Sequence, residues 1–193
     1  MTEYGELIKL LAQRSVKRGR FTLASGKTSD LYIDVRMTSM SPEGLSLIGP
    51  LGLHAIRDTG WPVDAVGGMT LGADPIAYAI SYTSSLIPPL IRAFTVRKET
   101  KAHGTNKLIE GPFRSGDRVI VVEDVITSGA SALRAIDAVT SAGGNIQGVL
   151  ALVDREDGGR AAIEAKGYNV ISIVPIGEIL ASMTDSGPSS FDA

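Results

Sequence analysis

The stretch that most constrains the fold is a run of four β-branched apolar residues at positions 119–122. An unbroken run of this kind predicts a strand buried on both faces, as in a parallel sheet covered by helices. Two acids, Glu123 and Asp124, stand where that strand should end. A small, hydroxyl-rich turn at 127–131 leads into an alanine-rich segment at 132–139 with helical spacing of its apolar residues. We therefore expect a strand, a turn and a helix, with a polar site at the turn.

The turn has the chemistry of a phosphate site. Free N–H groups at the start of a helix bind anions, and Gly129 lets the main chain approach a ligand closely. Hydroxyl donors are added by Thr127, Ser128 and Ser131. Because the two acids would repel a phosphate, we expect a sugar diol against them, with its 5′-phosphate in the turn. The acids could also stabilise a cationic sugar carbon or hold Mg²⁺ through water, and the alternative to all of these is an ordinary capped turn.

Composition excludes several classes of protein. The chain has 193 residues, 44% hydrophobic and 21% charged, which is typical of a single globular domain, 1–193. A net charge of −2 argues against nucleic-acid binding, and no apolar run is long enough to cross a membrane. The absence of cysteine excludes disulfides and thiolate catalysis, so we expect a cytoplasmic protein.

Strand and helix signals alternate through the middle of the chain. This alternation predicts an α/β fold with a parallel five-stranded sheet, helices on both faces and right-handed crossovers. Before it we expect a helix at 2–17 that stops at Gly19 and a hairpin at 21–36, and after it a short helix at 176–183. The strands are expected near 63–66, 90–96, 119–122, 146–153 and 169–175, and the helices between them at 41–56, from Pro75, at 132–139 and at 160–166.

Three further stretches lie where predicted strands end. Glycines at 67, 68 and 72 make a second loop with exposed N–H groups, although a tight structural turn would have the same pattern. A basic run at 97–107 suits a departing pyrophosphate in a mobile lid, and the alternative is a solvated face. Arg155 is placed for ligand contact unless it pairs with Asp154 or Glu156. Because ligands bind beyond the carboxyl ends of parallel strands, we expect these stretches to meet residues 123–131.

Together these stretches resemble orotate phosphoribosyltransferases over nearly the whole chain. The motif at 119–132 is similar to the signature with which type I phosphoribosyltransferases bind phosphoribosyl diphosphate (PRPP). F-T-L-x-S-G-x-x-S and Y-I-D-x-R, within 21–36, resemble the N-terminal hood of the family. R-K-x-x-K-x-H-G at 97–104 resembles its catalytic lid, and L-V-D-R-E at 152–156 resembles the segment that carries its orotate-side arginine.

The resemblance implies the type I phosphoribosyltransferase fold, with a hood formed by residues 1–36 and the C-terminal segment over a core at 40–175. It implies a glycosyltransferase that transfers phosphoribosyl from PRPP to orotate, giving orotidine 5′-monophosphate and pyrophosphate in pyrimidine (UMP) biosynthesis. It also implies Mg²⁺, held mainly through PRPP and water, for which we assign no direct protein ligand, and a homodimer whose lid crosses to the neighbouring active site. Nucleic acid and membranes are not expected partners.

The resemblance implies a role for each site residue. Catalytic roles fall to Lys101, His103 and Asp124. Orotate is expected against Thr127, Arg155, Tyr32, Ile33 and Lys27. PRPP is expected against Arg97, Lys98, Lys101, His103, Glu123, Asp124, Val125, Ile126, Thr127, Ser128, Gly129, Ala130 and Ser131.

Two positions depart from the pattern of some family members, which carry lysine where this chain has Ala24 and Tyr-Lys where it has Leu71 and Gly72. Lys27 stands near the first position, and main-chain N–H groups alone would grip pyrophosphate at the second. Two other functions stay open: a phosphoribosyltransferase for a purine or xanthine, and a regulatory protein that kept the PRPP site and binds nucleic acid. An orotate anion would favour Arg155, whereas the net acidity of the chain disfavours the regulatory protein.

Overall fold

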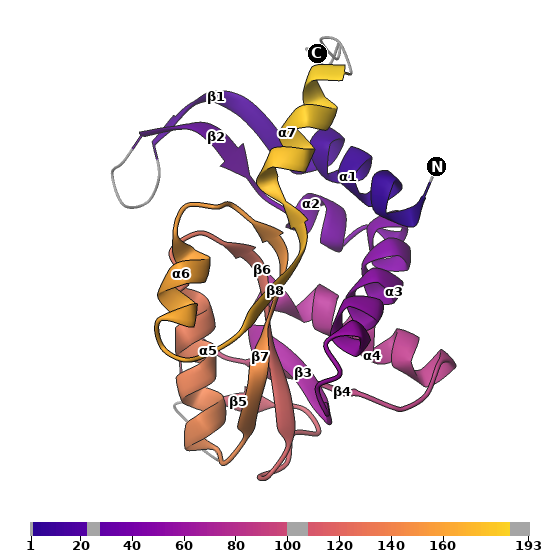
Figure 1. The fold of residues 1–193 in the computed structure, drawn as a ribbon, viewed down its shortest axis with the longest axis vertical. Helices are drawn as coiled ribbons and strands as arrows, with labels where there is room; N and C mark the ends of the chain where they lie inside the picture. The colour runs from indigo at the N-terminus through magenta and orange to yellow at the C-terminus, as the bar shows by residue number, and fades with distance from the viewer. Residues whose placement is uncertain (1, 23–27, 100–107, 186–193) are drawn as a thin grey trace.

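The computed structural model describes residues 2–22, 28–99 and 108–185. At its centre is a sheet of six strands in the order β5-β4-β3-β6-β7-β8 (Figure 1). Five strands run parallel, which confirms the predicted sheet, and the short β5 pairs antiparallel with β4 at the edge. The sequence missed β5 because a strand of two residues carries no periodic signal. The bounds are β3 (Ala65–Met69), β4 (Arg92–Val96), β5 (Ile109–Glu110), β6 (Arg118–Ile126), β7 (Asn145–Asp154) and β8 (Val170–Pro175).

The apolar run at 119–122 lies in β6, in the middle of the sheet. All four of its side chains are fully buried. Val119 and Val121 belong to one hydrophobic core, whereas Ile120 and Val122 belong to the other. Because side chains alternate between the two faces of a strand, a strand that is apolar at every position must be covered on both sides.

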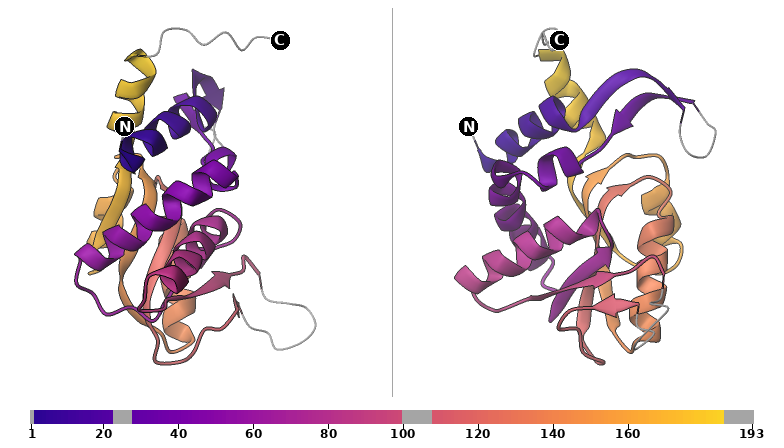
Figure 2. Two further views of the ribbon diagram at one scale, coloured as in Figure 1. Left: turned by 90° about the vertical axis from the view of Figure 1, so that its right-hand side faces the viewer. Right: turned by 180° about the vertical axis from the view of Figure 1, so that it is seen from behind.

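Helices cover both faces of the sheet (Figures 1 and 2). On one face α3 and α4 pack against each other and against the strands, and on the other face α5 and α6 do the same. Ser41 caps α3, as its sequence predicts, by accepting a hydrogen bond from the Gly44 N–H. Within the described residues, no helix is both long and apolar enough to cross a bilayer. The bounds are α3 (Pro42–Asp58), α4 (Ala73–Leu86), α5 (Ala130–Ser141) and α6 (Gly159–Glu164).

An N-terminal hairpin and the first and last helices form a hood beside the carboxyl ends of the strands (Figure 1). Here α1 packs against α7, and β1 pairs antiparallel with β2. The predicted helix stop at Gly19 is wrong, because α1 ends at Arg14 and Gly19 lies inside β1. Val16, which we assigned to the helix, instead pairs with Ile33 at the base of the hairpin. The bounds are α1 (Glu3–Arg14), β1 (Val16–Thr22), β2 (Thr28–Ile33), α2 (Arg36–Ser39), which the sequence did not predict, and α7 (Ile176–Asp185).

A second correction concerns the end of β6. The strand continues to Ile126, which pairs with Asp154 of β7. Glu123 and Asp124 therefore lie within the strand rather than after it. The helix α5 also begins earlier than expected, at Ala130, so the turn between strand and helix is shorter than the sequence indicated.

Candidate active site

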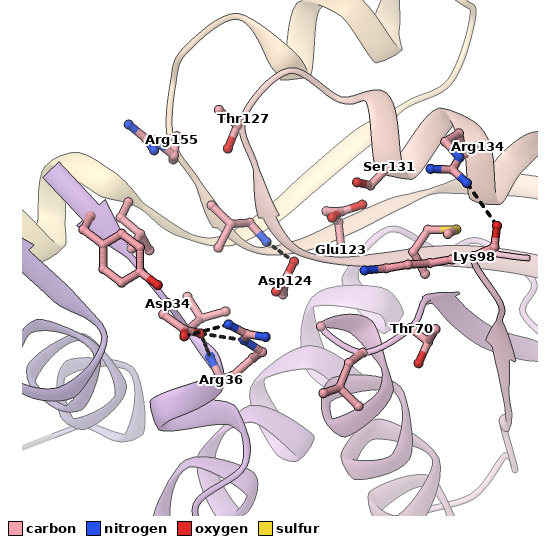
Figure 3. Close-up of a pocket in the computed structure, with 17 residues that line it drawn as sticks. Asp34, Arg36, Thr70, Lys98, Glu123, Asp124, Thr127, Ser131, Arg134 and Arg155 are labelled. Atoms are coloured by element: carbon pink, nitrogen blue, oxygen red, sulfur yellow. Dashed lines mark hydrogen bonds and ion pairs between the residues drawn. The ribbon is translucent and has the colours of Figure 1, made fainter. Parts of the chain in front are cut away.

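A pocket of about 330 Å³ opens at the carboxyl ends of the parallel strands, beside the hood (Figure 3). Arg155 and Thr127 lie at one end, the two acids of β6 lie in the middle, and Lys98 and Arg134 lie at the other end. The loop after β3, Lys98 of the basic run and Arg155 therefore meet the stretch at 123–131, as expected, whereas residues 100–107 of the basic run lie outside the described residues. The lining residues are Tyr32, Ile33, Asp34, Val35, Arg36, Met69, Thr70, Leu71, Gly72, Lys98, Glu123, Asp124, Val125, Thr127, Ser131, Arg134 and Arg155.

Of the two adjacent acids of β6, Glu123 is buried and Asp124 is half-buried. Burial, together with the neighbouring charge of Asp124 and a side-chain interaction with it, raises the pKa of Glu123 to about 8. Burial also raises the pKa of Asp124, against the lowering effects of the Val125 N–H, which donates to Oδ1 at 2.9 Å, and of Arg36. Glu123 Oε2 has no hydrogen-bond partner, and neither acid forms an ion pair within the described residues. Such a pair fits a ligand that brings hydroxyl donors or positive charge.

The turn after β6 is shaped by close packing. Gly129 has a φ of 78°, a left-handed conformation that favours glycine. A Cβ atom there would also lie 2.9 Å from the Gly159 carbonyl oxygen and from Ile163 Cγ1. The helix α5 begins at Ala130, directly after this turn, and Thr127 before it and Ser131 in its first turn line the pocket. This geometry suits an anion such as a phosphate.

The loop after β3 reaches the same pocket from the other side. Thr70, Leu71 and Gly72 all line it. A Cβ atom on Gly72 would lie only 2.1 Å from Asp124 Oδ2, so the main chain of this loop rests against the acid. The prediction of a loop with three glycines is therefore partly wrong: Gly67 and Gly68 lie inside β3, and only Gly72 belongs to the loop that forms a wall of the pocket.

Arg155 lines the end of the pocket that lies opposite Lys98, and an acid of the same turn, Asp157, pairs with it. Its Nε lies 3.0 Å from Asp157 Oδ2, and its side chain is 14% exposed. Neither acid that we considered as its partner pairs with it. Asp154 instead accepts from Arg160 Nε at 2.8 Å and from the Glu156 N–H at 2.9 Å, which fixes the turn that carries Arg155.

Curated relatives match almost the entire chain. An orotate phosphoribosyltransferase of Aquifex aeolicus is 44% identical over 183 residues, covering 93% of this chain and 99% of the relative. The chain belongs to the orotate phosphoribosyltransferase family. A relative of the same name from Mycobacterium tuberculosis is 44% identical over 174 residues, covering 90% of this chain and 94% of the relative. No protein-family model matches the chain.

Solved structures of orotate phosphoribosyltransferases share the fold. The Mycobacterium tuberculosis enzyme in complex with inorganic phosphate has a TM-score of 0.80 at 41% identity, covering 92% of this chain and 98% of that chain. The same enzyme in complex with PRPP has a TM-score of 0.78 at 39% identity, covering 92% and 99%. An adenine phosphoribosyltransferase from Saccharomyces cerevisiae, at 17% identity and a TM-score of 0.65, shares the fold alone. The predicted type I phosphoribosyltransferase fold is confirmed.

The site residues that the family resemblance implied are only partly gathered in the pocket. Arg97 lies outside its lining, where NH1 pairs with Glu110 Oε1 at 3.2 Å. Ile126 is buried in a hydrophobic core, and Ser128 and Gly129 of the turn and Ala130, the first residue of α5, are not among the lining residues. Predictions for Lys27, Lys101 and His103 lie outside the described residues. The predicted residues that line the pocket are Tyr32, Ile33, Lys98, Glu123, Asp124, Val125, Thr127, Ser131 and Arg155.

Two arginines of the pocket, Arg36 and Arg134, are not among the site residues that the family resemblance implied. Arg36 donates from Nε and NH2 to the two carboxylate oxygens of Asp34, both at 2.8 Å. Arg134 donates from NH2 to the Lys98 carbonyl oxygen at 3.3 Å. A signal existed for each: Arg36 ends the Y-I-D-x-R motif, and Arg134 stands three residues after Ser131 on the same helix.

Proposed function

We propose that this chain transfers the phosphoribosyl group of PRPP to orotate, releasing pyrophosphate and giving orotidine 5′-monophosphate. The observation that carries this proposal is one pocket in which two acids without an ion-pair partner among the described residues lie in the middle, with Arg155 and Thr127 at one end and Lys98 at the other. The names of the relatives and the PRPP complex of one of them support the same reaction. A pentosyl transfer of this kind serves pyrimidine biosynthesis, and the cytoplasmic location expected from the sequence stays a prediction.

The acids are proposed to act on the ribose. The C–O bond between the anomeric carbon and pyrophosphate breaks, its electron pair leaves with pyrophosphate, and the ring nitrogen of deprotonated orotate forms the new bond. Positive charge develops on the sugar as this happens, and carboxylates beside it lower the barrier. Hydroxyl groups of the ribose would supply the donors that Glu123 Oε2 lacks, which would favour the ionised form of the acid.

Arg155 is proposed to bind the carboxylate of orotate. Its guanidinium pairs with Asp157, whose side chain is 49% exposed. A ligand carboxylate could take the place of Asp157 without leaving the guanidinium buried and unpaired. Tyr32 and Ile33 line the same pocket and offer apolar surface for the pyrimidine ring, and Tyr32 is steadied by Phe21, whose ring centroid lies 5.4 Å away. This end of the pocket therefore favours a flat anion over an uncharged purine.

Mg²⁺ is the proposed cofactor. In the parts of the chain that the structure describes, no cluster of three or more acids or histidines could hold a metal ion alone. The acid pair of β6, with one buried oxygen unbonded, fits an ion that is held mainly through the donor's own oxygens and water. When bound, Mg²⁺ would neutralise charge on the departing pyrophosphate. Lys98 and the loop after β3 would share that work.

A homodimer is proposed from one apolar face. Tyr78, Tyr82 and Leu86 stand four residues apart on α4 and are 51%, 68% and 64% exposed. Ile87 and Leu90 extend this face beyond the helix, at 52% and 67% exposed. Exposed apolar side chains gathered along one helix mark an interaction surface. Light scattering should give a mass twice that of the chain, and a monomeric mass at micromolar concentration would rule the dimer out.

Turnover tests the proposed function directly. Protein, Mg²⁺, PRPP and orotate are mixed, and the ultraviolet absorbance of orotate is followed. Turnover of adenine, guanine or xanthine without turnover of orotate would show that the substrate is wrong. A Lys101→Ala variant should lose about tenfold or more of its kcat while it still binds PRPP, because a lysine of the basic run is proposed to neutralise the leaving group. Lys166→Ala, outside the pocket lining, is the matched control.

A further inference from the structure

Asp74 is a buried acid near the pocket that the proposed reaction does not use. It is 8% exposed and lies in the first turn of α4. Its Oδ2 accepts a hydrogen bond of 2.7 Å from Thr70 Oγ1, and its Oδ1 accepts one of 2.8 Å from Thr95 Oγ1. The hydroxyl of Thr95 also lies 2.7 Å from that of Tyr78. One carboxylate thus connects the loop after β3 with α4 and β4.

Helix capping does not explain this acid. An acid in the first turn of a helix commonly accepts from free N–H groups there or interacts with the helix dipole. Both oxygens of Asp74 instead accept from hydroxyls that lie outside α4. Because a buried carboxylate is costly unless its oxygens are bonded, the arrangement fixes Thr70 and Thr95 relative to the helix.

The loop that Asp74 holds has little room to move. Thr70 and Gly72 line the pocket, and the Thr70 N–H also donates to the Val96 carbonyl oxygen at 2.8 Å. The main chain at Gly72 rests directly against the carboxylate of Asp124. A shift of the loop toward β6 would displace that carboxylate, and a shift away would widen the pocket at the place proposed for the diphosphate.

We infer that Asp74 is a positioning residue for the pyrophosphate subsite, an inference that rests on the proposed function. The loop has Leu71 and Gly72 in its centre and therefore no cationic side chain there. Its main-chain N–H groups are the donors that it can offer to a diphosphate. Donors of this kind act well only when they are held in place before the ligand binds. Asp74 supplies that restraint through Thr70, without touching the ligand.

Thr70→Val tests the inference, because it removes the hydroxyl that binds Asp74 at nearly constant side-chain size. The Kd of pyrophosphate with Mg²⁺, measured by calorimetry, and the KM for PRPP should both rise about tenfold or more. The KM for orotate should change by less than about twofold, because the base binds at the other end of the pocket. Thr83→Val is the matched control. The hydroxyl of Thr83, like that of Thr70, donates to a residue of α4, here to the Ala79 carbonyl oxygen at 2.8 Å, and Thr83 does not line the pocket.

Asp74→Asn provides a second, milder variant. Its amide oxygen can still accept from Thr70 while its NH₂ group donates to Thr95, so it should keep more pyrophosphate affinity than Thr70→Val. Equal pyrophosphate affinities of Thr70→Val and Thr83→Val would overturn the inference, as would an equal rise in both KM values. A parent chain that turns over no orotate would instead refute the proposed function, and its pyrophosphate affinities would still decide the role of Asp74.

Discussion

The middle of the pocket and the end that holds Arg155 differ in how their charged side chains are paired. In the middle, the buried Glu123 and the half-buried Asp124 have no ion-pair partner among the described residues, and their pKa values are raised. At the other end, Arg155 pairs with Asp157 at 3.0 Å. Arg36, nearer the acids, pairs with Asp34 at 2.8 Å, and this pairing lowers the pKa of that acid. In the proposed binding mode, the acids gain a partner when a ligand binds. The arginines instead exchange their acid partners for the ligand.

The difference follows from where the residues stand in the chain. Adjacent acids inside a buried strand can be reached only by groups from other elements, and within the described residues no cationic side chain forms an ion pair with them. Each arginine has an acid two residues away in a turn or strand end, so the pair forms locally at little cost in chain entropy. A local acid also orients the guanidinium before a ligand arrives.

The largest expected effect comes from the unpaired acids. Asp124→Asn should lower kcat about 10²-fold, because it removes a charge proposed to stabilise the cationic sugar. Steady-state kinetics with saturating PRPP and orotate measure this effect. Asp137→Asn is the matched control, since it is the same substitution in α5, the helix that follows β6, at a residue that does not line the pocket. A loss smaller than about threefold would mean that the charge of Asp124 is not needed in the transition state.

A smaller effect is expected on the KM for orotate when the Arg155–Asp157 pair is changed. This KM should rise in one variant and fall in the other. Arg155→Lys should raise the KM for orotate about tenfold or more, because a lysine cannot reproduce a bidentate bond to a carboxylate. Asp157→Asn should lower the same KM by about twofold, because the ligand no longer competes with an internal acid. The KM for PRPP is the internal control in both variants. A rise in the orotate KM of Asp157→Asn would show that orientation by the acid outweighs competition.

Sequence reasoning located the site better than it assigned partners. The apolar run at 119–122 and the alternation of elements were enough to place the polar stretches at one edge, because strand ends in a parallel sheet share that edge. Which acid pairs with Arg155 depends on a turn in which Glu156 has a φ of 58° and Asp154 is taken by Arg160. Sequence distance alone cannot reveal such geometry.

Short or irregular elements could not be predicted from the sequence for a similar reason. The two-residue β5 and the four-residue α2 are too short for a periodic signal. The sequence predicts a helix stop at Gly19, whereas the residue lies in a strand whose register shifts between Arg18 and Phe21. A glycine is compatible with either position, and only the pairing with β2 decides between them.

The smallest expected effect is on stability and concerns Glu123. Its pKa is raised from 4.5 to about 8 by folding, so between these pH values the native state holds a proton that the unfolded chain has lost. Stability from this acid is therefore present at low pH and is lost as the pH rises through about 8. Without ligand, the Tm of the parent should fall between pH 6 and pH 9 by about 3 °C more than the Tm of Glu123→Gln, which carries no charge there. The Tm values are measured by differential scanning calorimetry. An equal fall of Tm with pH in the two proteins would show that Glu123 of the parent is already ionised at pH 6. The contrast between the middle of the pocket and the Arg155 end would then rest on the arginine pairs alone.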